Sequence, residues 1–238
     1  MLRAVLADLH LGQVSGDMER FAAALEKVRA RGAGEVVFLG DLFRTLVGFR
    51  RYWDGDVVAG LEGLAALRRN GVRVVLIEGN RDFFLDAAEL DPFRDAAVQA
   101  HSFSAGGRRF LLEHGDLVNT RDRQYRFWRR LSKSPAARLW ARLLPAFLAR
   151  RIVRGTESRL SQTNFSYRRV LPEDDLERAA RRHFGAGVDV VFWGHFHRGW
   201  RLEDGGRVAE VVPGWMETGT IVWVRPDGTW SAEAGETP

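Results

Sequence analysis

Short apolar runs alternate with helical patterns over much of the chain. A short apolar run bounded by turn residues is typical of a buried strand, whereas apolar residues that recur every three or four positions indicate a helix. The sequence therefore predicts an α/β fold, with strands over 2–7, 36–39, 72–77, 108–113 and 188–193 and helices over 17–31, 54–69 and from Pro172 to about 183.

The pattern changes after residue 96, where the pieces become shorter and more strand-like. Gly106-Gly107 separates the runs 97–104 and 108–113, as in a tight hairpin turn. From residue 200 onward polar and apolar residues alternate, and glycine or proline clusters interrupt the alternation. Residues 200–230 are therefore expected to supply antiparallel strands of a second sheet.

Residues 121–154 differ in composition from the rest of the chain, because Arg residues alternate with large apolar ones and Asp122 is the only acidic residue. One apolar stripe with helical spacing is formed by Leu139, Trp140, Leu143, Leu144, Phe147 and Leu148. Pro145 is expected to kink or split this helix. We interpret about 121–165 as a helical insertion within one domain that spans 1–238. It is a helix pair packed on the core with a solvated basic face, a cap that meets an acyl chain and anionic headgroups, or both together.

Composition narrows the kind of protein and the kind of site. A chain of 238 residues can bury one good core, and its net charge of +5 with a pI near 10.3 favours an anionic partner. The chain has no cysteine, so nitrogen and oxygen atoms would have to hold any metal. Met1 leads straight into a core strand and no apolar run approaches the roughly 20 residues of a membrane span, so we expect neither a signal peptide nor a transmembrane helix.

Metal-ligand side chains follow the ends of the predicted strands. They are Asp8, His10, Asp41, Asn80, His114, His195 and His197. Each is weak evidence alone, since a Gly-Asp pair is usually a turn and a strand histidine is usually a core residue, but strand ends converge at one edge of an α/β sheet. Imidazole and carboxylate ligands without sulfur suit Mn, Fe, Zn or Co, and seven of them, with Asp41 as a bridge, fit two cations about 4 Å apart. His101 and His183 remain as structural or surface residues.

The motif order resembles that of the calcineurin-like metallophosphoesterases across nearly the whole chain. The motifs are Asp8-Leu9-His10, Gly40-Asp41, Gly79-Asn80, His114 and Gly194-His195-Phe196-His197. The resemblance implies a central β-sandwich flanked by helices. It also implies one metal held by Asp8, His10, Asp41 and His197, and a second held by Asp41, Asn80, His114 and His195.

A narrower resemblance rests on Arg81, which stands where most members of that superfamily have a histidine. With Gly79-Asn80-Arg81-Asp82-Phe83 and His114-Gly115-Asp116, the chain looks like the UDP-2,3-diacylglucosamine pyrophosphohydrolases of lipid A biosynthesis, in which a helical insertion also follows the His-Gly-Asp motif. This resemblance implies that two divalent metals, most often Mn, support cleavage of the pyrophosphate to UMP and 2,3-diacylglucosamine 1-phosphate, called lipid X.

The same resemblance implies roles for individual residues. Catalysis would fall to Asp41, Asn80, Arg81 and His114, with Arg81 steadying phosphate charge in the transition state. Substrate contacts would come from Asn80, Arg81, Asp122, Tyr125, Asn164 and His195. Arg44, Phe196 and Tyr167 depart from the family pattern, and these departures affect the acyl-sugar contacts rather than the metals.

The implied partners are a UDP-linked acylated glucosamine and an anionic inner-membrane surface, with no nucleic acid. The protein would then be cytoplasmic and peripherally associated with the inner membrane through its basic insertion. One alternative is a generic dimetal phosphodiesterase that acts on nucleotides or nucleic acid and uses the insertion to bind a polyanion. Another is a non-catalytic membrane-surface protein with vestigial histidines, which the seven intact ligand positions disfavour.

Overall fold

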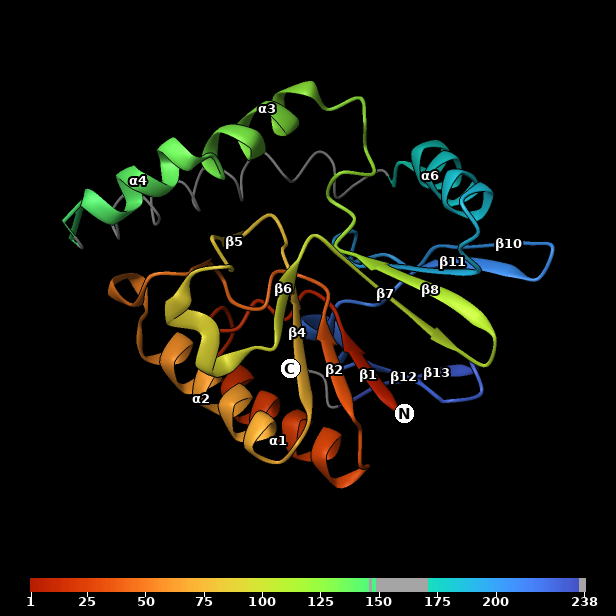
Figure 1. Cartoon of the computed structure of the whole chain (residues 1–238), viewed down its shortest axis with the longest axis horizontal. Coiled ribbons are helices and arrows are strands. Elements are labelled where there is room, and N and C mark those ends of the chain that lie inside the picture. The colour runs from red at the N-terminus through yellow and green to blue at the C-terminus, as the bar shows by residue number, and fades with distance from the viewer. Residues whose placement is uncertain (146, 149–170, 236–238) are drawn as a thin grey trace.

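Two β-sheets face each other in the computed structural model, which describes residues 1–145, 147–148 and 171–235 (Figure 1). The larger sheet has the strand order β13-β12-β1-β2-β4-β6. Its strands are β1 (Arg3–Leu6), β2 (Glu35–Phe38), β4 (Arg73–Ile77), β6 (Ala96–Val98), β12 (Ile221–Val224) and β13 (Trp230–Glu233). β1, β2, β4 and β6 are parallel, and β12 and β13 add an antiparallel edge.

The smaller sheet has the order β10-β11-β9-β8-β7. Its strands are β7 (Ala100–Ala105), β8 (Arg108–Glu113), β9 (Val190–Trp193), β10 (Arg201–Asp204) and β11 (Arg207–Val211). β8, β9 and β11 are parallel, whereas β7 and β10 are antiparallel edges. A separate pair, β3 (Leu46–Val47) and β5 (Asp82–Phe83), lies beyond the ends of the larger sheet.

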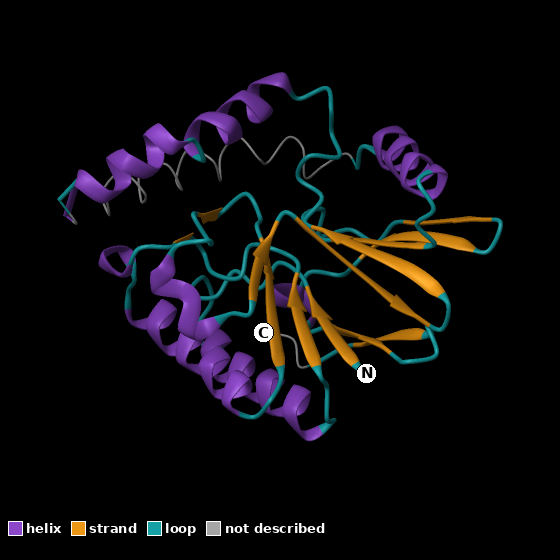
Figure 2. Cartoon of the chain, viewed as in Figure 1, coloured by secondary structure: helices purple, strands orange, loops and turns teal. Residues whose placement is uncertain are grey.

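Helices cover the outer faces of both sheets (Figure 2). α1 (Asp17–Ala30) and α2 (Gly55–Arg69) pack against the larger sheet, and α6 (Glu173–Gly185) packs against the smaller one. Side chains such as Val5, Val37, Phe110 and Phe192 fill the space between the sheets. Shorter helical segments are α7 (Trp215–Thr218) and two 3₁₀ turns, Arg50–Tyr52 and Ala88–Phe93. The sandwich flanked by helices is therefore confirmed.

Two further helices, α3 (Arg123–Ser132) and α4 (Pro135–Leu143), lie on the side of the molecule toward which the parallel strands of the larger sheet point (Figure 1). The side chains of Asp122 and Ser134 cap their first turns. α4 ends two residues before Pro145, which agrees with the expected split. Among the described residues no helix is both long and apolar enough to cross a bilayer.

Two strand predictions are wrong in part, although β7 and β8 do form the expected hairpin. The run 97–104 is two strands, β6 and β7, which join different sheets on either side of Gln99. In the tail only β10 and β11 join the second sheet, whereas β12 and β13 complete the first. Every residue of β12 is buried, because the strand pairs with β1 and has packed side chains on both faces. Alternation along the sequence does not tell which sheet has an open edge.

Candidate metal centre

The ligand-type residues come together where the strands of the two sheets end. Asp8 follows β1, Asp41 follows β2 and Asn80 follows β4, and these three strands are neighbours in the larger sheet. His114 and His195 follow the adjacent strands β8 and β9 of the smaller sheet. Ligand sites of open α/β sheets form at this kind of edge.

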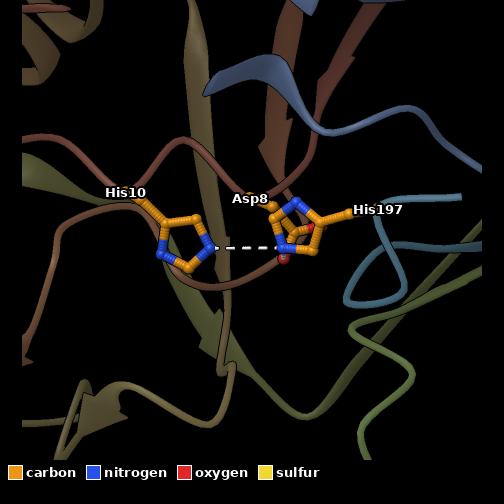
Figure 3. A group of neighbouring side chains, drawn as sticks. All are labelled: Asp8, His10 and His197. Atoms are coloured by element: carbon orange, nitrogen blue, oxygen red, sulfur yellow. Dashed lines mark hydrogen bonds and ion pairs between the residues drawn. The ribbon is translucent and has the colours of Figure 1, made fainter. Parts of the chain in front are cut away.

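The first group consists of Asp8, His10 and His197, whose ligand atoms all lie within 4.8 Å of one another. The Nε2 atoms of the two histidines are 3.4 Å apart, and their rings are stacked with an interplanar angle of 11° (Figure 3). The Oδ1 atom of Asp8 lies 4.0 Å from Nε2 of His197. Two imidazole nitrogens and a carboxylate oxygen that face a common point are typical of a divalent-cation site.

The second group consists of Asp8, Asp41 and His114. Nδ1 of His114 is 2.6 Å from the carbonyl oxygen of Leu39, so this nitrogen carries a proton and donates it. Nε2 then faces Asp41 Oδ1 at 3.8 Å and Asn80 Oδ1 at 3.0 Å. Asp8 lies near the donating Nδ1 instead, at 4.0 Å. Asp8 is the residue common to both groups, yet the ligand face of His114 is directed at Asp41.

Asp8 offers a direct test of whether these residues fit a cation. Its side chain is buried, and Oδ2 accepts the backbone N–H of His195 at 2.6 Å. Oδ1 is also buried but has no hydrogen-bond partner among the described residues. A buried carboxylate oxygen left without a partner is costly, and a divalent ion would satisfy it. The donor set therefore fits a bound metal.

The backbone is unusual at the same residues. Asp8, His10, Asp41, His195 and His197 all have positive φ angles, between 48° and 71°. Residues other than glycine avoid this left-handed region, at a cost of about 1–2 kcal/mol each. Among the described residues other than glycine, Phe84 alone has a positive φ angle without being a predicted ligand. Such clustered strain is typical of functional sites.

Two glycines allow the strand ends to approach each other. A Cβ atom on Gly40 would lie 2.5 Å from Nδ1 of His114, and one on Gly79 would lie 2.3 Å from Oδ1 of Asp41. Neither position can hold a larger residue without displacing a predicted ligand. The Gly-Asp and Gly-Asn motifs therefore have a steric cause.

Electrostatics favours the ligand forms of His10, His195 and Asp41, whereas burial raises the pKa of Asp8. Burial lowers the pKa of His10 to about 3 and that of His195 to about 4, so both rings are neutral at pH 7. Burial opposes ionisation of Asp41, but His114, His10 and Arg81 together lower its pKa to about 2. Burial also opposes protonation of His114, yet Asp41 and Asp8 raise the pKa of His114. These two carboxylates therefore favour the protonated form of His114, with which a metal would compete.

Sequence reasoning missed Asp82, which is buried beneath the site. One of its oxygens accepts the backbone N–H groups of Asp41, at 2.8 Å, and Gly79, at 2.9 Å. Burial and the nearby Asp41 carboxylate raise the pKa of Asp82 to about 7. Asp82 thus holds together the loops that carry Asp41 and Asn80. Its place in the Gly-Asn-Arg-Asp motif was the available signal.

A cleft opens over the two groups and contains five of the six predicted substrate-binding residues. They are Asn80, Arg81, Asp122, Tyr125 and His195. Arg81 has its Nε 3.7 Å from Asp41 Oδ2, and its backbone N–H donates to Asp41 Oδ1 at 2.8 Å. Asn164 lies outside the described residues.

Asp122 and Tyr125 also have structural partners at the rim of the cleft. Asp122 Oδ1 accepts the backbone N–H of Tyr125 at 2.8 Å and so caps α3. The Tyr125 hydroxyl donates to buried Asp116, which also accepts from Arg129 Nε at 2.5 Å. Asp116 follows His114 by two residues, so these contacts fasten α3 to a loop of the metal centre.

Comparison with known proteins identifies the family. Residues 1–199 match the calcineurin-like phosphoesterases. Over 252 aligned residues, the chain is 30% identical to "UDP-2,3-diacylglucosamine hydrolase" of Stenotrophomonas maltophilia (strain K279a), covering 98% of each chain. A relative with the same name from Pseudomonas putida (strain F1) is 31% identical over 207 residues, or 82% of this chain and 81% of the relative.

Solved structures show the same fold at low sequence identity. A "novel archaeal phosphodiesterase" superposes with a TM-score of 0.54 at 14% identity, over 99% of this chain and all of the other. A "dimetal phosphatase" from Danio rerio superposes with a TM-score of 0.50 at 17% identity, over 99% of each chain. The family match, the fold and the site agree: this chain belongs to the calcineurin-like phosphoesterase family and is a metal-dependent hydrolase.

Proposed function

We propose that this protein hydrolyses the pyrophosphate of UDP-2,3-diacylglucosamine to UMP and 2,3-diacylglucosamine 1-phosphate. The observation that carries the proposal is one cleft in which Arg81, Asp122 and Tyr125 stand beside the metal-ligand side chains. The names of the relatives, which align over most of the chain, support the same substrate.

Two divalent ions, for which we propose Mn, would supply a nucleophilic water and neutralise the developing charge on the phosphoryl oxygens. Asp8, His10, Asp41 and His197 would hold one, and Asp41, Asn80, His114 and His195 the other. We propose that Asp41 would be shared by the two ions, because Nε2 of His114, the nitrogen free to act as a ligand, faces Asp41 Oδ1 at 3.8 Å.

Arg81 is the proposed electrostatic catalyst. Its side chain is mostly buried and lies beside Asp41, at the wall of the cleft where a phosphate would sit. A fixed guanidinium at that place would stabilise the charge of the transition state. Asp122, Tyr125 and Asn164 would contact the sugar and its acyl groups, and His195 and Asn80 the phosphate.

We also propose that the insertion, about 121–165, caps the site and binds acyl chains and an anionic membrane surface. α3 and α4 expose large apolar side chains, namely Phe127, Trp128, Leu131, Leu139, Trp140 and Leu143. Trp140 is 65% and Leu143 68% exposed. Apolar residues among many Arg residues favour an interface with anionic lipid. The protein would then associate peripherally with the cytoplasmic face of the inner membrane.

Turnover of UDP-2,3-diacylglucosamine, with and without Mn²⁺, tests the substrate. Bis-p-nitrophenyl phosphate serves as a generic phosphodiester for comparison. The proposal predicts fast Mn-dependent release of UMP and little cleavage of the generic ester. The reverse pattern would support the alternative, a dimetal phosphodiesterase that acts on nucleotides or nucleic acid.

Co-sedimentation with vesicles of phosphatidylglycerol and phosphatidylethanolamine tests the membrane surface. Replacement of Trp140 and Leu143 by Ser should weaken binding, because it removes exposed apolar side chains. Val58→Ser on α2, where Val58 is 42% exposed, is the matched control and should bind as the wild type does. Equal binding by all three proteins would contradict the proposal for α4.

A further inference from the structure

Glu217, on the short helix α7, lies against one of the predicted metal ligands. Its Oε1 is 2.8 Å from Nδ1 of His197. Gly214 makes room for this pair, since a Cβ atom there would lie 2.4 Å from Glu217 Oε2 and 2.9 Å from His197 Nδ1. None of the sequence motifs includes Glu217, and it lies beyond the family match, which ends at residue 199.

α7 is fixed to the strand that delivers the first ligands. The backbone N–H of Trp215 donates to the carbonyl of Ala7 at 2.7 Å, and that of Met216 donates to the carbonyl of Asp8 at 3.3 Å. The Trp215 side chain is buried and packs edge-on against Phe21 of α1. The position of Glu217 relative to Asp8 is therefore set by backbone contacts and core packing.

The contact with Glu217 decides which nitrogen of His197 is available as a ligand. A carboxylate accepts hydrogen bonds, so Nδ1 of His197 must carry the proton in this pair. Nε2 then keeps its lone pair and faces Nε2 of His10 at 3.4 Å and Oδ1 of Asp8 at 4.0 Å. Carboxylate partners of this kind orient a histidine ligand and make it more basic.

We propose that Glu217 is a positioning residue, which holds the His197 ring with Nε2 directed into the metal group formed with Asp8 and His10. The inference rests on the proposed metal-binding role of those residues and not on the identity of the substrate. Glu217 is 43% exposed as a side chain, so its loss should affect the orientation of His197 more than the packing of the core.

Metal binding by purified protein gives the first readout. Titration calorimetry with Mn²⁺ on the metal-free protein should show two sites in the wild type. In Glu217→Ala one site should weaken by about 10- to 100-fold and the other should keep its affinity. Glu217→Gln retains an acceptor for Nδ1–H and should recover part of the lost affinity. Glu62→Ala, an exposed glutamate on α2, is the control and should bind as the wild type does.

The tautomer of His197 in the metal-free protein gives the second readout, by nitrogen-15 NMR at a pH where the ring is neutral. Nδ1 should be protonated in the wild type and in Glu217→Gln, and the Nε2–H form should appear in Glu217→Ala. Unchanged affinities together with an unchanged tautomer in Glu217→Ala would overturn the inference. A wild type that fails to bind two Mn²⁺ ions would instead contradict the proposed metal centre.

Discussion

Strand β2 has a buried carboxylate cluster at each end, and the two clusters differ in how their charge is balanced. At its start, Glu35 contacts Arg3 at 2.9 Å, Arg73 at 3.0 Å and His101 at 3.2 Å. Just past its end, the side chains that could balance the charge of Asp41 lie farther away, with Arg81 Nε at 3.7 Å and His114 Nε2 at 3.8 Å. Nearby Asp8 keeps a buried oxygen without a hydrogen-bond partner among the described residues.

This difference separates a structural cluster from a functional one. Glu35 has its countercharges within the chain, and residues of β1, β2, β4 and β7 share in the contacts. The Asp41 cluster has its countercharges at longer distances, and it holds strained backbone. Buried charges need partners, and the proposed cations would complete those of the second cluster.

Loss of the Asp41 carboxylate should have the largest effect. We expect Asp41→Asn to lower kcat for UDP-2,3-diacylglucosamine by at least about 10³-fold, or about 4 kcal/mol, because the proposed bridge between the metals is gone. Release of UMP measures this. Glu35→Gln is the matched control at the other end of β2 and should keep wild-type kcat while folded. Appreciable turnover by metal-stripped Asp41→Asn would refute the dimetal mechanism.

Loss of the Glu35 charge should instead lower stability. We expect Glu35→Gln to reduce the free energy of unfolding by about 3 kcal/mol, because buried Arg3 would lose its partner. Urea unfolding of the metal-free protein at pH 7 measures this effect. Asp41→Asn should be less destabilising in the same assay, because the charge of Asp41 lies beside the buried carboxyl groups of Asp8 and Asp82 and raises the pKa of both, so its removal also relieves repulsion. Equal losses in the two variants would remove the distinction between the clusters.

Added metal should stabilise the protein only through the Asp41 cluster, just past the end of β2. At 100 times the dissociation constant, Mn²⁺ should raise the free energy of unfolding by about 2.7 kcal/mol for each site. Glu35→Gln should show the same gain from its lower baseline, and Asp41→Asn a smaller one. Thermal unfolding with and without Mn²⁺ tests this expectation. A gain that depended on Glu35 would be inconsistent with it.

The smallest expected effect is the pH dependence of the contribution that Glu35 makes to the free energy of unfolding. Burial opposes its ionisation, yet hydrogen bonds from His101 and Arg3 hold the pKa of Glu35 below its ordinary value of 4.5. Its stabilisation is therefore fully present above pH 4.5 and is lost as the pH falls through the lower pKa of the folded state. The difference in unfolding free energy between wild type and Glu35→Gln should be constant above that pH and shrink below it. A difference that grew as the pH fell would show that the pKa of Glu35 is raised on folding, not lowered.

The hydrophobic pattern could predict the α/β fold and the residues that gather at the sheet edge, because each predicted ligand follows an apolar strand. The sandwich was implied by the family resemblance. Their role in binding metal stays a prediction. The contacts of Asp82 with Gly79 and Asp41, and of Glu217 with His197, depend on how loops fold over one another. The placement of β12 beside β1 likewise depends on which sheet edge is open, which local alternation does not encode.

Anomalous diffraction from crystals grown with Mn²⁺ would test the central claim most directly. We predict two manganese peaks about 4 Å apart, with an Asp41 carboxylate oxygen in contact with both. One peak should lie beside His10 and His197 and the other beside Asn80 and His114. A single peak, or two peaks that Asp41 does not join, would contradict this account of the site.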